Sequence, residues 1–338
     1  MIPSILKIAK KILVLAVFVL LFFLSWFSSV FTSPKKGMEA ETVFEVQKGE
    51  SARDIAQNLR ERGMIRREWA FILGYKLFFA PRSLKAGEYA FRFPCSTKNV
   101  LEQITNGEVI LHPVTVPEGL TRLETAEQIQ SQTGITRESF LLSSEETSLI
   151  EDLDTQAGDL EGYLYPETYN FVKGFGARDL VVAMVSQFRE VFSTQWQNTA
   201  VDLGLTIRDV VILASLIEKE TSVAAERSLV SAVFHNRLKR GMKLDCDPTI
   251  IYVLKQEGRF KDRLRSKDLQ LDSPYNTYLY SGLPPGPIAN PGKESLWAAL
   301  NPAKVDYLYF VSKNDGSHHF SPTFREHQNA VLKYQKNK

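Results

Sequence analysis

The sequence predicts an α+β protein that begins with one membrane-spanning helix and continues into two folded parts. Three observations lead to this prediction. An uncharged apolar run covers residues 12–31, strand and helix patterns alternate after residue 43, and the 338 residues exceed the roughly 100 to 200 that usually share one hydrophobic core. With 41 basic and 39 acidic residues and no basic stripe interleaved with aromatic residues, the chain is not expected to bind nucleic acid.

The N-terminal run, "ILVLAVFVLLFFLSWFSSVF", has about the 20 residues that a bilayer-spanning helix needs. Lys7, Lys10 and Lys11 precede it, and positive charge near a span favours retention on the cytoplasmic side. We therefore expect a single-pass anchor with residues 1–11 in the cytoplasm, residues 12–31 in the membrane and the bulk of the chain outside the cytoplasm. A cleaved signal peptide is the alternative, although the run is longer than a typical signal core and no A-x-A-like cleavage site follows it.

A polar segment and a small α+β module follow the apolar run. Residues 32–42, "TSPKKGMEAET", are expected to form a linker. The module, residues 43–112, is predicted to open with a strand, a turn at Gly49 and an amphipathic helix capped by Ser51. A further strand, a turn and a short helix that ends at Gly107 complete it.

The larger second part, residues 113–338, contains the densest motifs. Thr206 and Asp209 form a capping-box pattern, which predicts a helix through "IRDVVILASLIEKETS". A second helix is predicted for residues 224–240. After it, "LDCDPTIIY" and "DSPYNTYLYSGLPPGPIANPG" are rich in Pro, Gly and Asn and are predicted to be loops. Long irregular loops in a compact domain are typical of segments that line a site.

Glu218 is a candidate for acid–base chemistry on the first of these helices. It shares a mostly small and apolar face with Ala214 and Ser215, whereas Glu220 lies about 200° round the helix axis and cannot act on the same target. A carboxyl that a substrate covers loses hydration, which favours its neutral, proton-donating form. The helical periodicity fits equally well an alternative in which residues 218–220 are simply the solvent-exposed end of the helix.

The other reactive residue types predict no metal and no organic cofactor. His318, His319 and His327 lie close together in sequence without a metal-ligand register such as HExxH, and Cys95 and Cys246 are isolated. No G-x-S-x-G nucleophile motif or phosphate-binding glycine loop is present. The tyrosines of "EGYLYPETY" and "SPYNTYLYSG" could cover the apolar faces of a sugar polymer, although core packing explains many of them equally well.

Six stretches of the second part resemble the family of endolytic murein lytic transglycosylases, the MltG family with its YceG-like domain. In the family's order these are "EGYLYPETY" (161–169), "ASLIEKE" (214–220), "ERSLVSAVFHNRL" (226–238), "MKLDCDPTIIY" (242–252), "SPYNTYLYSGLPPGPIANPG" (273–292) and "HHFSPTFREH" (318–327). Where the family often has Gln, this chain has Asp245. The first part resembles the family's LysM-like portion, most closely at "FEVQKGES". The resemblance implies a LysM-like module at residues 43–112 and a YceG-like α+β catalytic domain at residues 113–338.

The resemblance also implies an activity. It implies a lyase that cleaves the bond between N-acetylmuramic acid and N-acetylglucosamine within peptidoglycan strands, without water as the attacking group, and so limits the length of new strands. The family's catalytic glutamate falls on Glu218, which would protonate the glycosidic oxygen and then accept the proton of the muramyl 6-hydroxyl, leaving a 1,6-anhydro end. The matched loops imply substrate binding by Tyr165, Asp247, Thr249, Tyr252, Asn276, Thr277 and Tyr278.

The same resemblance implies a location and partners. The protein is expected in the bacterial inner membrane with its catalytic domain in the periplasm, near penicillin-binding peptidoglycan synthases. Two other functions stay open. A hydrolase of the muramidase type would need a second carboxyl, for which Asp247 and Glu226 are candidates. An anchored, non-enzymatic glycan-binding scaffold would need no catalytic carboxyl.

Overall fold

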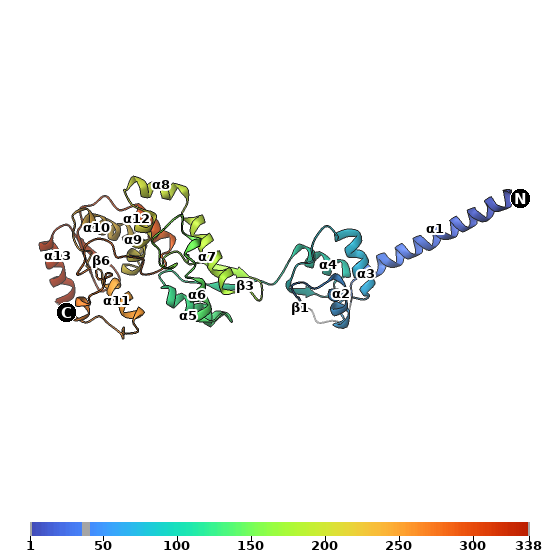
Figure 1. Cartoon of the computed structure of the whole chain (residues 1–338), viewed down its shortest axis with the longest axis horizontal. Coiled ribbons are helices and arrows are strands. Elements are labelled where there is room, and N and C mark those ends of the chain that lie inside the picture. Colours follow the sequence, from blue (N-terminus) through green and yellow to red (C-terminus); the bar gives the residue numbers. More distant parts are fainter. Residues whose placement is uncertain (1, 36–40, 337–338) are drawn as a thin grey trace. The chain divides into compact units, whose positions relative to one another are not determined.

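The computed structural model describes residues 2–35 and 41–336 and divides the chain into two compact units (Figure 1). The first unit comprises Met1–His112 and Asn170–Gly174, and the second comprises Pro113–Tyr169 and Phe175–Lys338. Helices alternate with short strands, which pair into two-stranded sheets in the described part of the chain. The predicted α+β class is therefore confirmed.

The first unit contains one antiparallel sheet and four helices. Its strands are β1 (Glu41–Val46) and β2 (Gly87–Arg92), and its helices are α1 (Ile2–Thr32), α2 (Ala52–Glu61), α3 (Glu68–Gly74) and α4 (Thr97–Asn106), with a π-helical turn at Tyr75–Phe79. Two predicted helix boundaries are confirmed. Ser51 Oγ accepts a hydrogen bond from Asp54 N at the start of α2, and Gly107, with φ +77°, ends α4 in the left-handed conformation.

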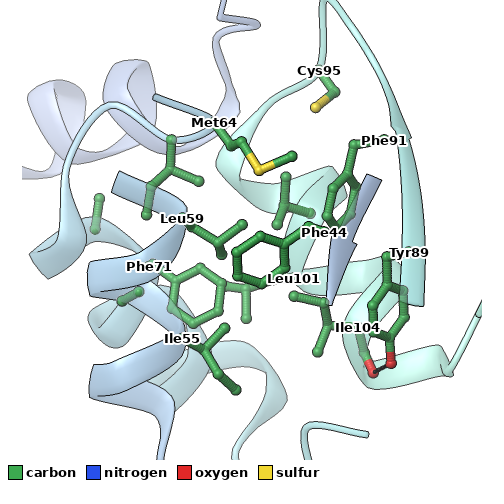
Figure 2. Packing of buried hydrophobic residues seen from close by; sticks show 14 of the residues in the cluster. Phe44, Ile55, Leu59, Met64, Phe71, Tyr89, Phe91, Cys95, Leu101 and Ile104 are labelled. Atoms are coloured by element: carbon green, nitrogen blue, oxygen red, sulfur yellow. Dashed lines mark hydrogen bonds between the residues drawn. The ribbon is translucent and has the colours of Figure 1, made fainter. Parts of the chain in front are cut away.

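The core of this unit lies between the sheet and the helices (Figure 2). Phe44 is buried while its neighbour Glu45 is exposed, because successive side chains of a strand point to opposite faces. Ile55, Ala56 and Leu59, the apolar face of the predicted helix α2, are all fully buried. Burial of each large apolar side chain contributes about 1.5 to 3 kcal/mol to folding. The likeness of this unit to a LysM module stays a prediction.

The last turns of α1 pack onto the first unit, while most of the helix is exposed. Phe31 is buried, and it can approach α3 because Gly74 has no side chain: a Cβ on Gly74 would lie 2.3 Å from the Phe31 ring. The rings of Trp26 and Trp69 are 4.9 Å apart. The segment Lys7–Thr32 is long and apolar enough to cross a membrane, and only 6% of its most apolar window is buried within the protein. This segment is the candidate membrane anchor.

The predicted linker, residues 32–42, is only partly described. Thr32 is the last residue of α1, residues 36–40 lie outside the described residues, and Glu41 already begins β1. Lys35 N donates a hydrogen bond to Cys95 O at 2.8 Å, which fastens the start of this segment to the first unit.

From β3 onward the chain is mainly helical. Its helices are α5 (Arg122–Gln132), α6 (Arg137–Ser143), α7 (Ala177–Val191), α8 (Thr194–Asp202), α9 (Ile207–Glu220), α10 (Arg227–Lys239), α11 (Asp247–Gln256), α12 (Lys293–Leu300) and α13 (Phe324–Val331). Its strands are β3 (His112–Thr115), β4 (Thr168–Phe171), β5 (Tyr309–Ser312) and β6 (His318–Ser321), with β3 beside β4 and β5 antiparallel to β6. Short 3-10 turns lie at Thr147–Leu149, Ala224–Glu226 and Asp268–Gln270, and a π-helical turn at Leu332–Lys336.

Helix α9 is the central helix of the second unit. It begins with the predicted capping box, in which Thr206 Oγ1 accepts from Asp209 N at 3.1 Å and the Asp209 carboxylate accepts from Thr206 N at 2.9 Å. All residues from 210 to 217 are buried, as expected for a helix with neighbours on every side. It packs against α8, α10, α11 and α12, several of which are visible around it in Figure 1. Its C-terminal turn is where this buried helix meets solvent.

Two sequence-based boundaries differ from the structure. The helix predicted for residues 224–240 begins as a 3-10 turn at Ala224–Glu226, and α10 starts only at Arg227. The loop predicted for residues 244–252 is wrong, because α11 begins at Asp247. Pro248 is compatible with this helix because the first helical positions have no intrahelical acceptor for an N–H group. The second predicted loop, residues 272–292, contains no helix or strand.

Candidate active site

Glu218 occupies the last turn of α9, and its side chain is 8% exposed. Its Oε2 accepts a hydrogen bond from Gly292 N at 3.1 Å. Its Oε1 lies 3.9 Å from Arg227 Nη2, which is within ion-pair range but too long for a hydrogen bond. One carboxyl oxygen is thus held by backbone, and the other is left to interact with a ligand.

Gly119 also lies beside the Glu218 side chain. Gly119 has φ +75°, and a Cβ built on it would lie 3.4 Å from Glu218 Cγ. The neighbouring Lys219 on α9 donates from Nζ to Gly119 O at 3.0 Å. Any other residue at position 119 would be strained by this φ and would crowd the carboxyl side chain.

Asn290 holds together the segments that surround the end of α9. Its side-chain Oδ1 accepts hydrogen bonds from Gly162 N and Leu164 N, and its Nδ2 donates to Leu120 O. Asn290 is fully buried. One turn before Glu218, Ser215 Oγ accepts from Ile288 N at 3.1 Å and so ties the same segment to α9. The motifs "EGYLYPETY" and "GPIANPG" therefore meet at the end of α9.

A second carboxyl, Glu118, lies beside Glu218 and was not predicted from the sequence. A Cβ placed on Gly292 would be only 2.0 Å from Glu118 Oε1, so this carboxylate lies directly against the residue that donates to Glu218. Burial, followed by the charge of Glu218, raises the pKa of Glu118, and Arg227 opposes this shift. The only sequence signal was an acidic residue before a turn glycine in "PEGL".

Tyr165 is a predicted substrate-binding residue that feels the charge of Glu118. It is 6% exposed, and its backbone oxygen accepts from Tyr169 Oη at 2.6 Å. Burial, followed by the charge of Glu118, raises the pKa of Tyr165 to about 12. Its phenol therefore stays protonated and lies within the electrostatic reach of Glu118.

Asp247 and Tyr278 lie together at a different place, a cavity of about 500 Å³. Tyr278 Oη donates to Asp247 Oδ1 at 2.5 Å. Glu220 lines the same cavity, so Glu218 and Glu220 have different neighbours, as their helical spacing requires. Burial raises the pKa of Glu220 to about 7. The rings of Tyr309, Phe310 and Phe324 also line this cavity.

Thr249, Asn276 and Thr277 are buried and bonded within the protein. Thr249 Oγ1 donates to Cys246 O at 2.7 Å, and Thr277 Oγ1 accepts from Cys246 N at 2.9 Å. Asn276 Nδ2 donates to Leu269 O and Leu271 O. Thr249 and Thr277 fasten the loop that carries Tyr278 to the start of α11, and Asn276 fastens this loop to the segment of Leu269 and Leu271. A direct contact between them and a substrate stays a prediction.

Tyr252 lies on a small cavity of about 100 Å³, next to the buried Glu161. Its Oη donates to Glu161 Oε2 at 3.4 Å, and Arg122 N donates to Glu161 Oε1 at 2.9 Å. Burial, followed by the charge of Asp159, raises the pKa of Glu161 to about 8. The structure therefore brings Tyr252 to Glu161 and not to the carboxyl pair of Glu118 and Glu218.

Glu226, one of the two second carboxyls considered for a hydrolase, has a partner of its own. His318 donates to it from its backbone N at 2.9 Å, and His318 Nδ1 lies 2.7 Å from Glu226 Oε2. Burial alone would raise the pKa of Glu226, but these interactions outweigh burial and hold it below its usual value. Glu226 fixes the start of β6 to the turn before α10.

The described residues contain no group of three or more His, Cys, Asp or Glu side chains arranged to hold a metal ion. Cys95 and Cys246 are buried free thiols. Asp245, with φ +48°, pairs with Arg237 at 2.9 Å. Its neighbour Cys246 lies against Glu220, and burial followed by the charge of Glu220 raises the pKa of this thiol.

Comparison with known proteins places most of the chain in one family. The model of the YceG-like family matches residues 44–333. An endolytic murein transglycosylase of Bacillus subtilis is 33% identical over 319 residues, which cover 89% of this chain and 86% of that protein. A protein of the same name from Streptococcus pneumoniae strain D39 is 28% identical, and the match spans 57% of its length.

A solved structure shows the same relationship. The crystal structure of a YceG-like protein from Listeria monocytogenes is 31% identical, with a TM-score of 0.60, and the match covers 86% of this chain and 98% of that one. The resemblance seen in the six sequence stretches is thereby confirmed. The chain belongs to the YceG-like family of endolytic murein transglycosylases and is an enzyme of the lytic transglycosylase class.

Proposed function

We propose that this protein cleaves the bond between N-acetylmuramic acid and N-acetylglucosamine inside peptidoglycan strands and leaves a 1,6-anhydro-muramyl end. The observation that carries the proposal is the environment of Glu218. This single carboxyl, 8% exposed, has Oε2 held by Gly292 N and Oε1 free of a close partner. It lies where α9 reaches the surface, in a chain whose relatives are named murein transglycosylases.

The proposed reaction uses Glu218 twice. Because the Gly292 N–H group occupies Oε2, Oε1 is the oxygen that carries the proton. In the first step this proton passes to the glycosidic oxygen as its bond to the muramyl anomeric carbon breaks. In the second step the 6-hydroxyl of the same muramyl residue bonds to that carbon, and its proton returns to Glu218. No water is consumed, and the enzyme ends in its starting protonation state.

Hydrolysis is the second candidate, and the position of Glu118 is the observation that favours it. Hydrolytic glycosidases usually employ two carboxyls, one as acid and one as base or nucleophile. Of the partners considered from sequence, Glu226 is paired with His318 and Asp247 with Tyr278. Glu118 is the carboxyl beside Glu218 and would have to activate the water.

The end groups of the products separate the two reactions. We expect the full-length protein in detergent to release fragments from purified glycan strands whose muramyl ends are 1,6-anhydro, 18 mass units lighter than hydrolysis products because one water is not added. Mass spectrometry of the fragments measures this difference. Reducing muramyl ends in place of anhydro ends would establish hydrolysis and rule out the transglycosylase reaction.

We also propose that the cavity of Asp247 and Tyr278 binds a sugar of the strand. Aromatic walls and a few polar groups suit a sugar ring, which has apolar faces and polar edges. Thr249 and Thr277 support this cavity by holding the Tyr278 loop on α11, and Asn276 supports it by bonding the loop to Leu269 and Leu271. Tyr252 would bind the strand at a separate point next to Glu161, and Tyr165 would bind it near Glu118.

Tyr278→Phe should raise KM for glycan strands about fivefold with little change in kcat, because it removes a hydrogen-bonding group of about 1 kcal/mol from binding but not from the reacting atoms. Steady-state cleavage of strands of uniform length measures this. Tyr280→Phe is the matched control: Tyr280 belongs to the same loop, but it bonds Asp272 and does not line the cavity. Equal effects of the two substitutions would contradict the proposed binding site.

For the cell, we propose that α1 anchors the enzyme with Lys7, Lys10 and Lys11 on the cytoplasmic side and both folded units in the periplasm. This orientation gives the catalytic carboxyl access to strands as they leave penicillin-binding synthases, the expected partners. Cleavage within such strands would limit their length.

A further inference from the structure

The last turns of α1 and the first unit share a cluster of aromatic rings. The Trp26 ring on α1 lies 4.9 Å from the ring of Trp69 on α3, and the Phe31 ring lies 5.8 Å from the ring of Phe78 in the π-helical turn at Tyr75–Phe79. Phe31 is buried, but Phe78 and its neighbour Leu77 are each 60% exposed. Two large apolar side chains of the folded unit are therefore left uncovered next to the apolar helix.

These ring contacts fall within the part of α1 that is needed to cross a membrane. At about 1.5 Å per residue, the uncharged run of residues 12–31 is about 29 Å long, and a bilayer has a hydrocarbon core of about 30 Å. Trp26 precedes the end of this run and would lie about 8 Å inside the boundary of that core. Trp69 and Phe78 pack on the same turns of α1. The surface that carries them is therefore brought to the depth of the lipid when α1 spans the bilayer.

Basic side chains lie where the apolar run of α1 ends. Arg66 Nη2 donates to Pro34 O at 3.0 Å, and Arg60 Nη1 donates to Arg66 O at 2.9 Å. Lys35 follows Pro34 in the chain. Anionic headgroups attract such side chains, whose apolar stems can lie against acyl chains while the charge stays in the polar layer. The first unit thus presents apolar groups at the depth of the acyl chains and basic groups at the depth of the headgroups.

We propose that the first unit is partly embedded in the bilayer surface at the C-terminal end of α1, with Trp69, Leu77 and Phe78 among the acyl chains and Arg60 and Arg66 at the headgroups. This inference rests on the proposed role of α1 as a membrane anchor. It adds a second membrane contact, formed by α3 and the π-helical turn, to the helix that crosses the bilayer. Tryptophan suits this boundary because its ring is apolar and its N–H group is polar. The first unit is then held against the bilayer and does not extend freely into water.

Quenching of fluorescence by labelled lipids tests this contact. The full-length protein is reconstituted in vesicles of phosphatidylethanolamine and phosphatidylglycerol, with a fluorescent label on Leu77→Cys. Leu77 is exposed, so the substitution removes no core side chain, and the native Cys95 and Cys246 are buried. A nitroxide on the lipid near its headgroup should lower the fluorescence of this label about twofold, because interfacial segments lie about 5–10 Å into the boundary of headgroups and acyl chains. A nitroxide near the end of the acyl chain should lower it less.

Two labelled positions serve as controls. Val43 on β1 is exposed, and its side chain points away from the core because its neighbour Phe44 is buried. The core separates the sheet from the helices, so a label on Val43→Cys lies on the face of the first unit away from α3 and should not be quenched by either lipid. Leu21 is exposed near the middle of the apolar run. A label on Leu21→Cys reports on the anchor and should be quenched most by the nitroxide near the end of the acyl chain.

The outcomes separate this inference from the proposed anchor. Quenching at Leu21 without quenching at Leu77 would overturn the second membrane contact and leave the anchor intact, and the exposed apolar pair would then be a surface for a protein partner. Absence of quenching at Leu21 would overturn the anchor and this inference with it. Equal quenching at Val43 and Leu77 would show that the whole unit adsorbs to lipid, which would overturn the specific contact through α3 and the π-helical turn.

Discussion

Replacing Glu218 with glutamine should abolish strand cleavage while the protein stays folded. The amide can still accept from Gly292 N, so the loop around the site should keep its structure. It cannot donate a proton to the glycosidic oxygen and take one back, and loss of general acid–base catalysis typically costs about 100- to 10,000-fold in rate. Release of anhydro-muramyl fragments by Glu218→Gln and by the wild-type protein measures the effect.

A measurement of strand binding shows whether Glu218→Gln has lost catalysis alone. Binding of long glycan strands by Glu218→Gln should be nearly unchanged, because the cavity of Asp247 and Tyr278 is left intact. Glu190→Gln, which neutralises an exposed carboxyl on α7, is the matched control for the loss of one charge and should cleave normally. Normal cleavage by Glu218→Gln would refute the mechanism. If instead neither the wild-type protein nor Glu218→Gln cleaved strands but both bound them, the molecule would be a glycan-binding scaffold.

The second unit should lose stability as pH rises from about 5 to 8, and Glu161 should be a main cause. Its pKa is about 8 in the folded protein, against an ordinary value of 4.5. Between these values the folded state holds a proton that the unfolded state has released, so the free energy of unfolding falls with rising pH. At about 1.4 kcal/mol per unit of pKa, the contribution of Glu161 amounts to about 5 kcal/mol over the window.

Glu161→Gln isolates this contribution. The amide oxygen can accept from Arg122 N without titrating, so the variant should gain stability relative to the wild type at pH 8 and not at pH 5. A smaller dependence should remain because the pKa of Glu220 is also raised, to about 7. Urea unfolding of the full chain at both pH values, followed by hydrogen exchange in peptides from α5 and α11, measures the second unit specifically. Identical pH dependence in variant and wild type would show that Glu161 is ionised in the folded protein at neutral pH.

Local patterns predicted much of the fold. The capping boxes at Ser51 and Thr206 and the glycine end of α4 are decided by residues three or four positions apart, so they can be read from sequence. The sequence also predicts that Glu218 and Glu220 lie on different sides of α9, because an α-helix has 3.6 residues per turn. The start of α11 was missed because proline is favourable both in loops and in the first turn of a helix.

The composition of the site could be predicted only in part. Glu218 was identified by resemblance, but Asp247 and Tyr278 proved to lie on one cavity and Tyr252 on another. Thr249, Asn276 and Thr277 face one another or the backbone, because a loop without regular hydrogen bonds needs side chains to satisfy its buried polar groups. No residue spacing distinguishes a tyrosine that supports a loop from one that lines a cavity.

By itself the sequence determined the family, the α+β class, the apolar anchor segment and the identity of the acidic residue at the end of α9, since each depends on short patterns along the chain. Only the tertiary structure decided what surrounds that residue. Glu118 and Gly292 are 100 and 74 positions away from Glu218, and they meet it because Asn290 and Ser215 bind distant backbone segments to one helix. Contacts of this kind form only when the whole unit folds, because their partners share no local pattern.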